Sequence, residues 1–178
     1  MKEVKLNDKE FEIFIDSIEI DKIISQIADK INNSSIKDPL FIAILNGSFL
    51  FAADLIRKIN IPNSEISFLK LASYDGLSTT GKVNELIGLS KEIKGRNIIV
   101  LEDIIDTGIT LEKIIELLEK EGVKTIKIAS LLFKPESYSK KFNIDYIGKS
   151  IKNDFVVGYG LDYNEKGRNL KNIYKLKN

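Results

Sequence analysis

The residues best suited to chemistry lie in one stretch near the middle of the chain, residues 102–110. Two adjacent acids, Glu102 and Asp103, follow an apolar segment, and after two isoleucines comes the run Asp106-Thr107-Gly108-Ile109-Thr110. The apolar segment predicts a strand, and the periodic segment after the run predicts a helix. A turn between a strand and a helix presents free backbone N–H groups, which bind phosphate. The stretch therefore predicts an anion site with two carboxylates beside it.

The side chains of this stretch suit a sugar phosphate. Gly108 lets the backbone approach a ligand closely, and the hydroxyls of Thr107 and Thr110 can donate hydrogen bonds to phosphate oxygens. Glu102 and Asp103 can accept hydrogen bonds from two sugar hydroxyls, or help to hold a cation. A plain turn with a capped helix is the simplest alternative. The tripeptide Asp-Thr-Gly also occurs in aspartic proteases, but the amphipathic helix expected at residues 110–121 argues against that class.

Histidine and cysteine are absent from the 178 residues. This excludes a catalytic triad, a histidine base, thiol chemistry and zinc held by either residue type. The chemistry must use carboxylates, lysine, arginine, tyrosine, hydroxyls and backbone groups. When every available metal-ligating atom is an oxygen, a hard cation is favoured, so magnesium is the predicted metal.

The charge balance favours a small-molecule partner or a second copy of the chain. Lys and Arg number 27 and Asp and Glu number 26, so the basic excess of a nucleic-acid binder is missing. No apolar run approaches the roughly 20 residues that span a bilayer, and the first nine residues do not form a signal peptide. We therefore expect a single cytoplasmic domain over residues 1–178 that binds neither nucleic acid nor membrane.

Strands and helices alternate along the chain and must position the 102–110 stretch. A helix is predicted after Ser17 as N-cap, because five isoleucines from Ile20 to Ile31 fall on one face. Continuous apolar runs predict strands buried on both faces. Strands are expected at residues 11–16, 40–45, 66–72, 83–89, 97–101, 124–132, 155–158 and 173–176, and further helices at 49–58 and 110–121.

This alternation predicts an α/β fold, with a doubly wound, mostly parallel central sheet flanked by helices. Ligands of such sheets bind at the carboxyl ends of the strands. The loops after Leu45, Leu101 and Leu132 are therefore the expected places for a site.

The stretch from Glu102 to Thr110 resembles the signature with which type I phosphoribosyltransferases bind phosphoribosyl pyrophosphate (PRPP), in the form of the hypoxanthine-guanine branch. The resemblance extends from about Phe11 to Leu176. It implies the type I phosphoribosyltransferase fold, with a small hood and a flexible loop. It also implies purine salvage, in which hypoxanthine or guanine receives 5-phosphoribosyl from PRPP to give IMP or GMP and pyrophosphate. The implied PRPP contacts in this stretch are Glu102, Asp103, Asp106, Thr107, Gly108, Ile109 and Thr110.

Two other segments carry the resemblance on the PRPP side. Leu45-Asn46-Gly47-Ser48 is similar to the family's pyrophosphate loop, which implies a cis peptide between Leu45 and Asn46. Asn46 stands where many members have Lys, which removes a positive charge, and Ile109 likewise replaces a Lys of some members. Ser73-Tyr74 opens a polar segment, residues 73–82, that resembles the loop that closes over the reactants and excludes water.

Two further segments carry the family resemblance on the side of the site that would hold the purine base. Lys134 ends a predicted strand, and the resemblance implies that it donates to the 6-oxo group of the purine. Phe155 would stack on the base, and the Val156 carbonyl would face the edge that carries guanine's amino group. Asp162, beside the base, would reach magnesium together with Glu102 and Asp103, and Arg168 would contact pyrophosphate. With histidine absent, Asp106 is the candidate acid/base group on the purine's imidazole nitrogens.

Other functions of the same fold remain as alternatives. Lys134 and Phe155 argue against adenine and orotate but leave xanthine open. A PRPP-sensing regulator that binds nucleic acid would need an added domain or a basic face, and neither the length nor the net charge supports one. If the chain were a purely structural α/β domain, its five segments that match the family, in the same order, would have to be a coincidence. The family resemblance also implies a homo-oligomer, either a dimer or a tetramer.

Overall fold

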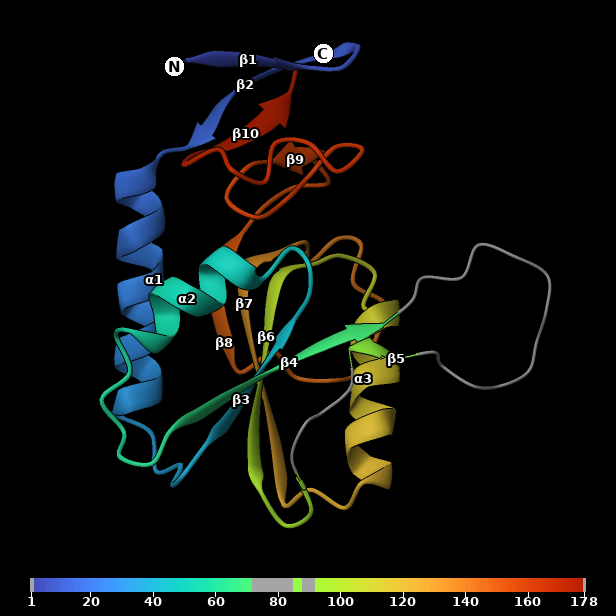
Figure 1. Cartoon of the computed structure of the whole chain (residues 1–178). Coiled ribbons are helices and arrows are strands. Elements are labelled where there is room, and N and C mark those ends of the chain that lie inside the picture. Colours follow the sequence, from blue (N-terminus) through green and yellow to red (C-terminus); the bar gives the residue numbers. More distant parts are fainter. Residues whose placement is uncertain (1, 72–84, 88–91, 178) are drawn as a thin grey trace, which may run out of the picture.

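The computed structural model describes residues 2–71, 85–87 and 92–177 and contains two β-sheets (Figure 1). The strands of the larger sheet are parallel except for β5, which pairs antiparallel with β4. The order across this sheet is β5 (Glu85–Ile87), β4 (Glu65–Leu71), β3 (Leu40–Ile44), β6 (Asn97–Ile105), β7 (Thr125–Phe133) and β8 (Tyr146–Ser150). The predicted α/β fold with a mostly parallel sheet is confirmed.

Helices cover both faces of this sheet. The helices α1 (Ser17–Asn32) and α2 (Phe49–Ile56) pack on one face, and α3 (Ile109–Lys120) packs on the other. The buried side of α1 is the isoleucine stripe expected from the sequence. Strand β3 is buried along its whole length because it lies between the two helical layers.

The smaller, antiparallel sheet forms a hood, and both ends of the chain belong to it. Its order is β1 (Glu3–Leu6), β2 (Lys9–Ile15), β10 (Ile173–Leu176) and β9 (Val156–Val157). Figure 1 shows the hood beyond the end of the central sheet at which α1 begins. The hood therefore brings the segment from β9 to β10 near the strand ends where a site is expected.

Several expected boundaries were wrong. β6 continues to Ile105, so Glu102 and Asp103 lie within the strand and not beyond its end. The strands β1 and β8 were not expected, because their polar, partly exposed sequences lack the apolar runs of central strands. Ser73, Tyr74 and the rest of the predicted flexible loop lie outside the described residues, and of the strand expected at 83–89 the structure describes β5.

The predicted N-cap of α1 was also wrong by one residue. The carboxylate of Asp16 accepts a hydrogen bond from the Glu19 backbone N–H at 2.8 Å, whereas Ser17 is the first helical residue. The Ser17 N–H instead donates to Asn172 Oδ1 at 2.9 Å, which ties the start of α1 to the hood. Within the described residues, no helix has the length and the apolar character that a membrane crossing requires.

Replacing Asp16 by Ala should destabilise the protein by about 1 kcal/mol, because the first turn of α1 loses its side-chain acceptor. For a domain of this size the melting temperature should fall by about 2–4 °C. The matched control, Ser17→Ala, should leave stability within about 0.5 kcal/mol of the original protein. Thermal unfolding followed by circular dichroism tests both variants. A larger loss for Ser17→Ala would contradict the assignment of Asp16 as the cap.

Candidate active site

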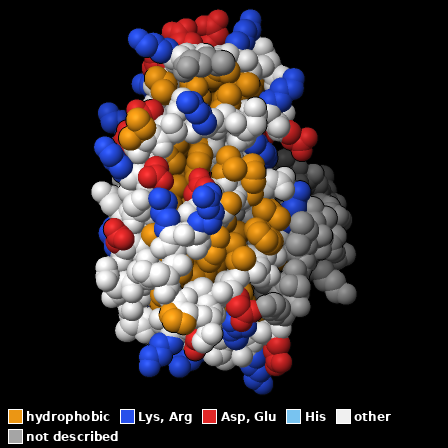
Figure 2. All heavy atoms as spheres, turned by 60° about the vertical axis from the view of Figure 1, so that its left-hand side comes forward, with side chains coloured by type: hydrophobic (Ala, Val, Ile, Leu, Met, Phe, Trp, Pro, Cys, Tyr) orange, Lys and Arg blue, Asp and Glu red, His pale blue; other side chains and the backbone are white. Residues whose placement is uncertain are grey.

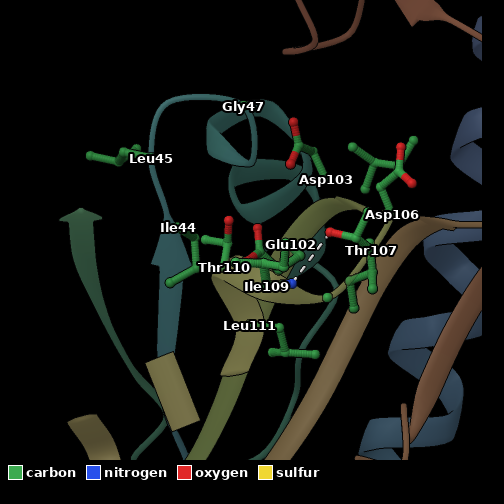
Figure 3. Close-up of a pocket in the computed structure, with 13 residues that line it drawn as sticks. Ile44, Leu45, Gly47, Glu102, Asp103, Asp106, Thr107, Ile109, Thr110 and Leu111 are labelled. Carbon is green, nitrogen blue, oxygen red and sulfur yellow. Dashed lines mark hydrogen bonds between the residues drawn. The ribbon is translucent and has the colours of Figure 1, made fainter. Parts of the chain in front are cut away.

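A cavity of about 260 Å³ opens at the carboxyl ends of β3 and β6 (Figure 3). It joins the loop after β3 to the turn between β6 and α3, which are two of the three places expected from the sequence. The lining residues are Ile44, Leu45, Gly47, Glu102, Asp103, Ile104, Ile105, Asp106, Thr107, Gly108, Ile109, Thr110 and Leu111.

The turn from β6 into α3 has the geometry of a phosphate cradle. Gly108 is the N-cap of α3 and has a left-handed φ of 83°, a conformation that favours glycine. The Ile109 N–H points back toward Thr107 Oγ1 at 3.5 Å, the contact drawn as a dashed line in Figure 3. A Cβ at Gly108 would lie 2.6 Å from Tyr138 Cε2 and 2.8 Å from Lys140 Cγ. The turn is therefore closely packed from behind, while residues 106–110 line the cavity, where N–H groups at the start of a helix suit an anion.

The two acids of β6 line the cavity beside this turn. Glu102 is buried, and burial together with the neighbouring Asp103 carboxylate raises the pKa of Glu102 well above its usual value. Burial raises the pKa of Asp103 to about 6, opposed by hydrogen bonds from backbone N–H groups and by the charge of Arg168. Both carboxyl groups are thus set apart from ordinary surface acids by a poorly solvated position.

The loop after β3 is packed tightly between β6 and the hood. The expected cis peptide between Leu45 and Asn46 is present. Asp103 lies so close to Gly47 that any Cβ there would overlap Asp103 Oδ2 (Figure 3). On the hood side, a Cβ at Gly160 would overlap the Gly47 carbonyl oxygen. Backbone groups of this loop, and not its side chains, therefore form this wall of the cavity.

The hood supplies a carboxylate and a guanidinium close to Asp103. Arg168 donates to the Gly160 carbonyl oxygen at 2.8 Å and forms an ion pair with Asp162 at 2.6 Å. Asp162 also accepts a hydrogen bond from the Glu165 backbone N–H at 2.7 Å. The charges of Asp162 and Arg168 both act on the pKa of Asp103, so the hood turn and β6 belong to one electrostatic site.

Lys134 and Asp106 form the other side of the site. Lys134 follows β7 and Asp106 follows β6, and these adjacent parallel strands bring Lys134 Nζ within 2.7 Å of Asp106 Oδ2. Lys134 is buried while Asp106 is half exposed, so a cationic donor is held firmly at the cavity edge by an accessible carboxylate. The predicted strand-end lysine is therefore not a freely solvated side chain.

Phe155 belongs to an aromatic group on the hood. It is 44% exposed and contacts Phe11, with a centroid separation of 6.2 Å, and Tyr163, edge-to-face at 5.9 Å. Lys9 Nζ lies over both Phe155 and Tyr163, at 5.7 Å and 4.9 Å from the ring centroids. Phe155 was indistinguishable from a core residue by sequence, but its exposed ring is available for stacking. The neighbouring Val156 is buried in β9.

The structure does not gather the predicted metal ligands into a ready cage. In the part of the chain that it describes, no three acidic side chains lie close enough together to hold an ion. Sequence analysis also missed Tyr138 and Lys140, which pack against Gly108, and Lys140 pairs with Glu112 of α3 at 2.6 Å. No motif marks these two residues, because they reach the turn only through the fold.

Comparison with known proteins identifies the class to which this fold and site belong. The family model described as "Phosphoribosyl transferase domain" matches residues 15–164, and the chain belongs to this family. The hypoxanthine phosphoribosyltransferase of Buchnera aphidicola is 39% identical over 174 residues, which cover 97% of this chain and 94% of that relative.

Two further comparisons point to the same branch. The hypoxanthine-guanine phosphoribosyltransferase of Streptococcus pyogenes is 44% identical over 142 residues, 79% of this chain and 78% of the relative. The crystal structure of a hypoxanthine-guanine phosphoribosyltransferase from Bacillus anthracis superposes with a TM-score of 0.84 at 36% identity, covering 94% of this chain and 97% of that one. The resemblance noted in the sequence is therefore confirmed across nearly the whole chain.

The raised pKa of Asp103 predicts a specific pH dependence of stability without metal or substrate. Between the ordinary pKa of 3.8 and about 6, the folded protein binds more protons at this site than the unfolded chain. The free energy of unfolding should therefore fall as pH rises through this interval, by on the order of 1–3 kcal/mol from this group, and then level off. Asp103→Asn should remove this contribution.

Urea unfolding of the two proteins at pH 4, 5, 6 and 7 measures the effect. The difference in unfolding free energy, variant minus original, should increase with pH because only the original protein must bury a charge. Asp38→Asn, which alters an exposed acid bonded to Asn63, is the control and should follow the original curve. Parallel curves for Asp103→Asn and the original protein would contradict the prediction.

Proposed function

We propose that this chain transfers 5-phosphoribosyl from PRPP to hypoxanthine or guanine, giving IMP or GMP and pyrophosphate in purine salvage. The observation that carries this proposal is the 2.7 Å contact between Lys134 and Asp106. It joins a buried donor suited to a 6-oxopurine to the turn that is suited to a sugar phosphate. The names of the relatives described above support the same reaction.

PRPP would be held by main-chain groups and acids of the cavity. The N–H groups of residues 106–110, with the hydroxyls of Thr107 and Thr110, suit the 5-phosphate. Ile109 brings no charge, so backbone amides and hydroxyls carry this contact. Glu102 and Asp103 suit the two ribose hydroxyls as acceptors.

The pyrophosphate half of PRPP would lie against the loop 45–47 and the hood. Backbone groups of Leu45, Asn46 and Gly47 and the Arg168 guanidinium are suited to its oxygens. Magnesium usually takes one or two carboxylates together with substrate phosphate oxygens, and Asp162, with Glu102 and Asp103, fits that pattern better than a closed cage. When bound, magnesium would neutralise charge on the pyrophosphate.

The purine would occupy the space between Lys134 and the hood. Lys134 can donate to the 6-oxo oxygen, and a 6-amino purine would leave that buried donor unpaired, which favours hypoxanthine and guanine over adenine. Phe155 offers a stacking surface, and the Val156 carbonyl suits guanine's amino group.

Transfer breaks the bond between the anomeric carbon and the pyrophosphate oxygen and forms a bond to a purine nitrogen. The sugar gains positive charge in the transition state while the leaving group gains negative charge. Arg168 and the loop amides stabilise the leaving group. The contacts of Lys134 and Phe155 with the purine hold the purine in line for attack. Asp106 accepts the proton that the purine's imidazole ring loses, with the Lys134 ammonium close by to stabilise the carboxylate.

We also propose a homo-oligomer. Phe49 on α2 and Phe68 on β4 are 39% and 41% exposed. Phe68 lies two residues from Ile66, which packs with the core beneath α2, so both phenylalanines belong to the α2 side of the sheet. Figure 2, with the α1 side of Figure 1 turned forward, shows hydrophobic side chains gathered across the middle of that face. An exposed patch of this kind suits a partner surface.

A cytoplasmic location stays a prediction from the sequence.

The test of function is pyrophosphate release with PRPP, magnesium and each purine in turn. Hypoxanthine and guanine should support turnover and adenine should not. Asp106→Asn should bind PRPP with a similar KM but lower kcat by about 100-fold or more, because general acid/base catalysis typically contributes 10²–10⁴-fold. Asp38→Asn is the control and should match the original enzyme. An unchanged kcat for Asp106→Asn would remove this residue from the acid/base role.

Phe68→Glu should shift the protein toward the monomer, because it places a charge in the proposed interface. Light scattering after gel filtration measures the molar mass. The control is Ile13→Glu, which makes the same change at a 38% exposed position on the hood and should leave the mass unchanged. An original protein that runs as a monomer at micromolar concentration would contradict the proposal.

A further inference from the structure

A tyrosine in a strained backbone conformation connects the hood to α2. Tyr159 has a φ of 51°, in the left-handed region, between Gly158 and Gly160, which have φ values of 95° and 99°. The left-handed region costs a non-glycine residue roughly 1–2 kcal/mol, so a third glycine would fit this turn more easily. Such residues persist where their side chains make contacts that offset the cost.

The side chain of Tyr159 makes one strong contact outside the hood. It is 7% exposed, and its hydroxyl donates to Asp54 Oδ2 at 2.6 Å, with Leu50 O at 3.4 Å. Burial, and then the Asp54 carboxylate, raise the pKa of Tyr159 well above its usual value, so the hydroxyl remains a donor. Asp54 lies near the end of α2, and among the described residues it also pairs with Arg57, at 3.5 Å on the surface.

The second point of attachment lies one residue further along the hood. The Gly160 backbone packs directly on the Gly47 carbonyl, and the Gly160 carbonyl accepts from Arg168. Gly47 and Asp54 stand at the two ends of one continuous segment, the loop after β3 and α2. The hood turn 158–162 is therefore fixed to this segment at two places, and Arg168 and Asp162 are held by the same turn.

We propose that the Tyr159–Asp54 hydrogen bond is a positioning contact: it docks the hood turn 158–162 on the loop 45–48 and so sets the affinity for PRPP, and not for the purine. The inference rests on the proposed function. Lys134 and Asp106 attach to β7 and β6. Phe155 and Val156 are held within the hood by Phe11 and by the pairing of β9 with β10, so the base side does not depend on this contact. Loss of the hydrogen bond lowers the fraction of molecules in which Arg168 and the loop face one pyrophosphate, and the apparent affinity falls by that fraction.

Tyr159→Phe tests the proposal, because it removes the hydroxyl and keeps the buried ring. KM for PRPP should rise about tenfold, in line with one lost hydrogen bond, while KM for hypoxanthine should change less than twofold. A merely structural role would reduce the amount of active enzyme and leave both KM values unchanged. Tyr146→Phe is the matched control, since Tyr146 lines a separate cavity with Asn97 and Lys124 at the opposite end of the sheet.

Variants of Asp54 test the same contact from its other partner. If Tyr159→Phe fails to fold, the Asp54 variants alone decide the proposal. Asp54→Ala should reproduce the PRPP effect, whereas Asp54→Asn keeps an acceptor oxygen and should stay within about threefold of the original enzyme. The double variant Tyr159→Phe/Asp54→Ala should be no worse than either single change, because both remove the same contact.

The outcomes separate this inference from the proposed function. An original enzyme that is inactive with every purine overturns the function, and the positioning role with it. An active original enzyme whose KM for PRPP is unchanged in Tyr159→Phe and in Asp54→Ala overturns the positioning role alone. Equal increases in both KM values, or additive effects in the double variant, also overturn it.

Discussion

The backbone at Gly47 is the constraint on which the site depends. Asp103 of β6 leaves no room for a Cβ on one side of this residue, and Gly160 of the hood packs on its carbonyl from the other. Three segments that are far apart in sequence thus meet at one residue without a side chain. A larger residue would have to push β6 or the hood away, and close packing in protein interiors gives little freedom to do so. The cavity keeps its shape because this contact is made by backbone.

This packing divides the site into two halves with different physical character. The half that we propose for PRPP is built from main-chain amides and carbonyls, with poorly solvated carboxyl groups whose pKa values are raised. The half that we propose for the base is built from side chains, namely the Lys134–Asp106 pair and the exposed ring of Phe155. Main-chain groups suit the phosphates of PRPP, whereas side chains can select one base among several.

The amount that the sequence could predict differs between these parts. The strands β3, β6 and β7 were found because a strand buried on both faces needs a continuous apolar run, and the turn at 106–110 because its residues are contiguous. The strands β1 and β8 and the cap at Asp16 were missed, because edge strands and caps are decided by one or two local contacts. The full extent of β6 was missed because its last residues include two acids, and their pairing with β7 extends the strand. Such contacts leave only a weak pattern in the chain.

The sequence by itself determined the class of fold, the absence of histidine and cysteine chemistry, and the turn at residues 106–110, because these follow from residue types and their spacing along the chain. Only the tertiary structure decided that Lys134 pairs with Asp106, that Lys140 lies behind Gly108, and that Tyr159 bonds to Asp54 across 105 residues. The physical reason is that these contacts depend on which strands are neighbours and how the hood is docked. Spacing along the chain carries no record of either.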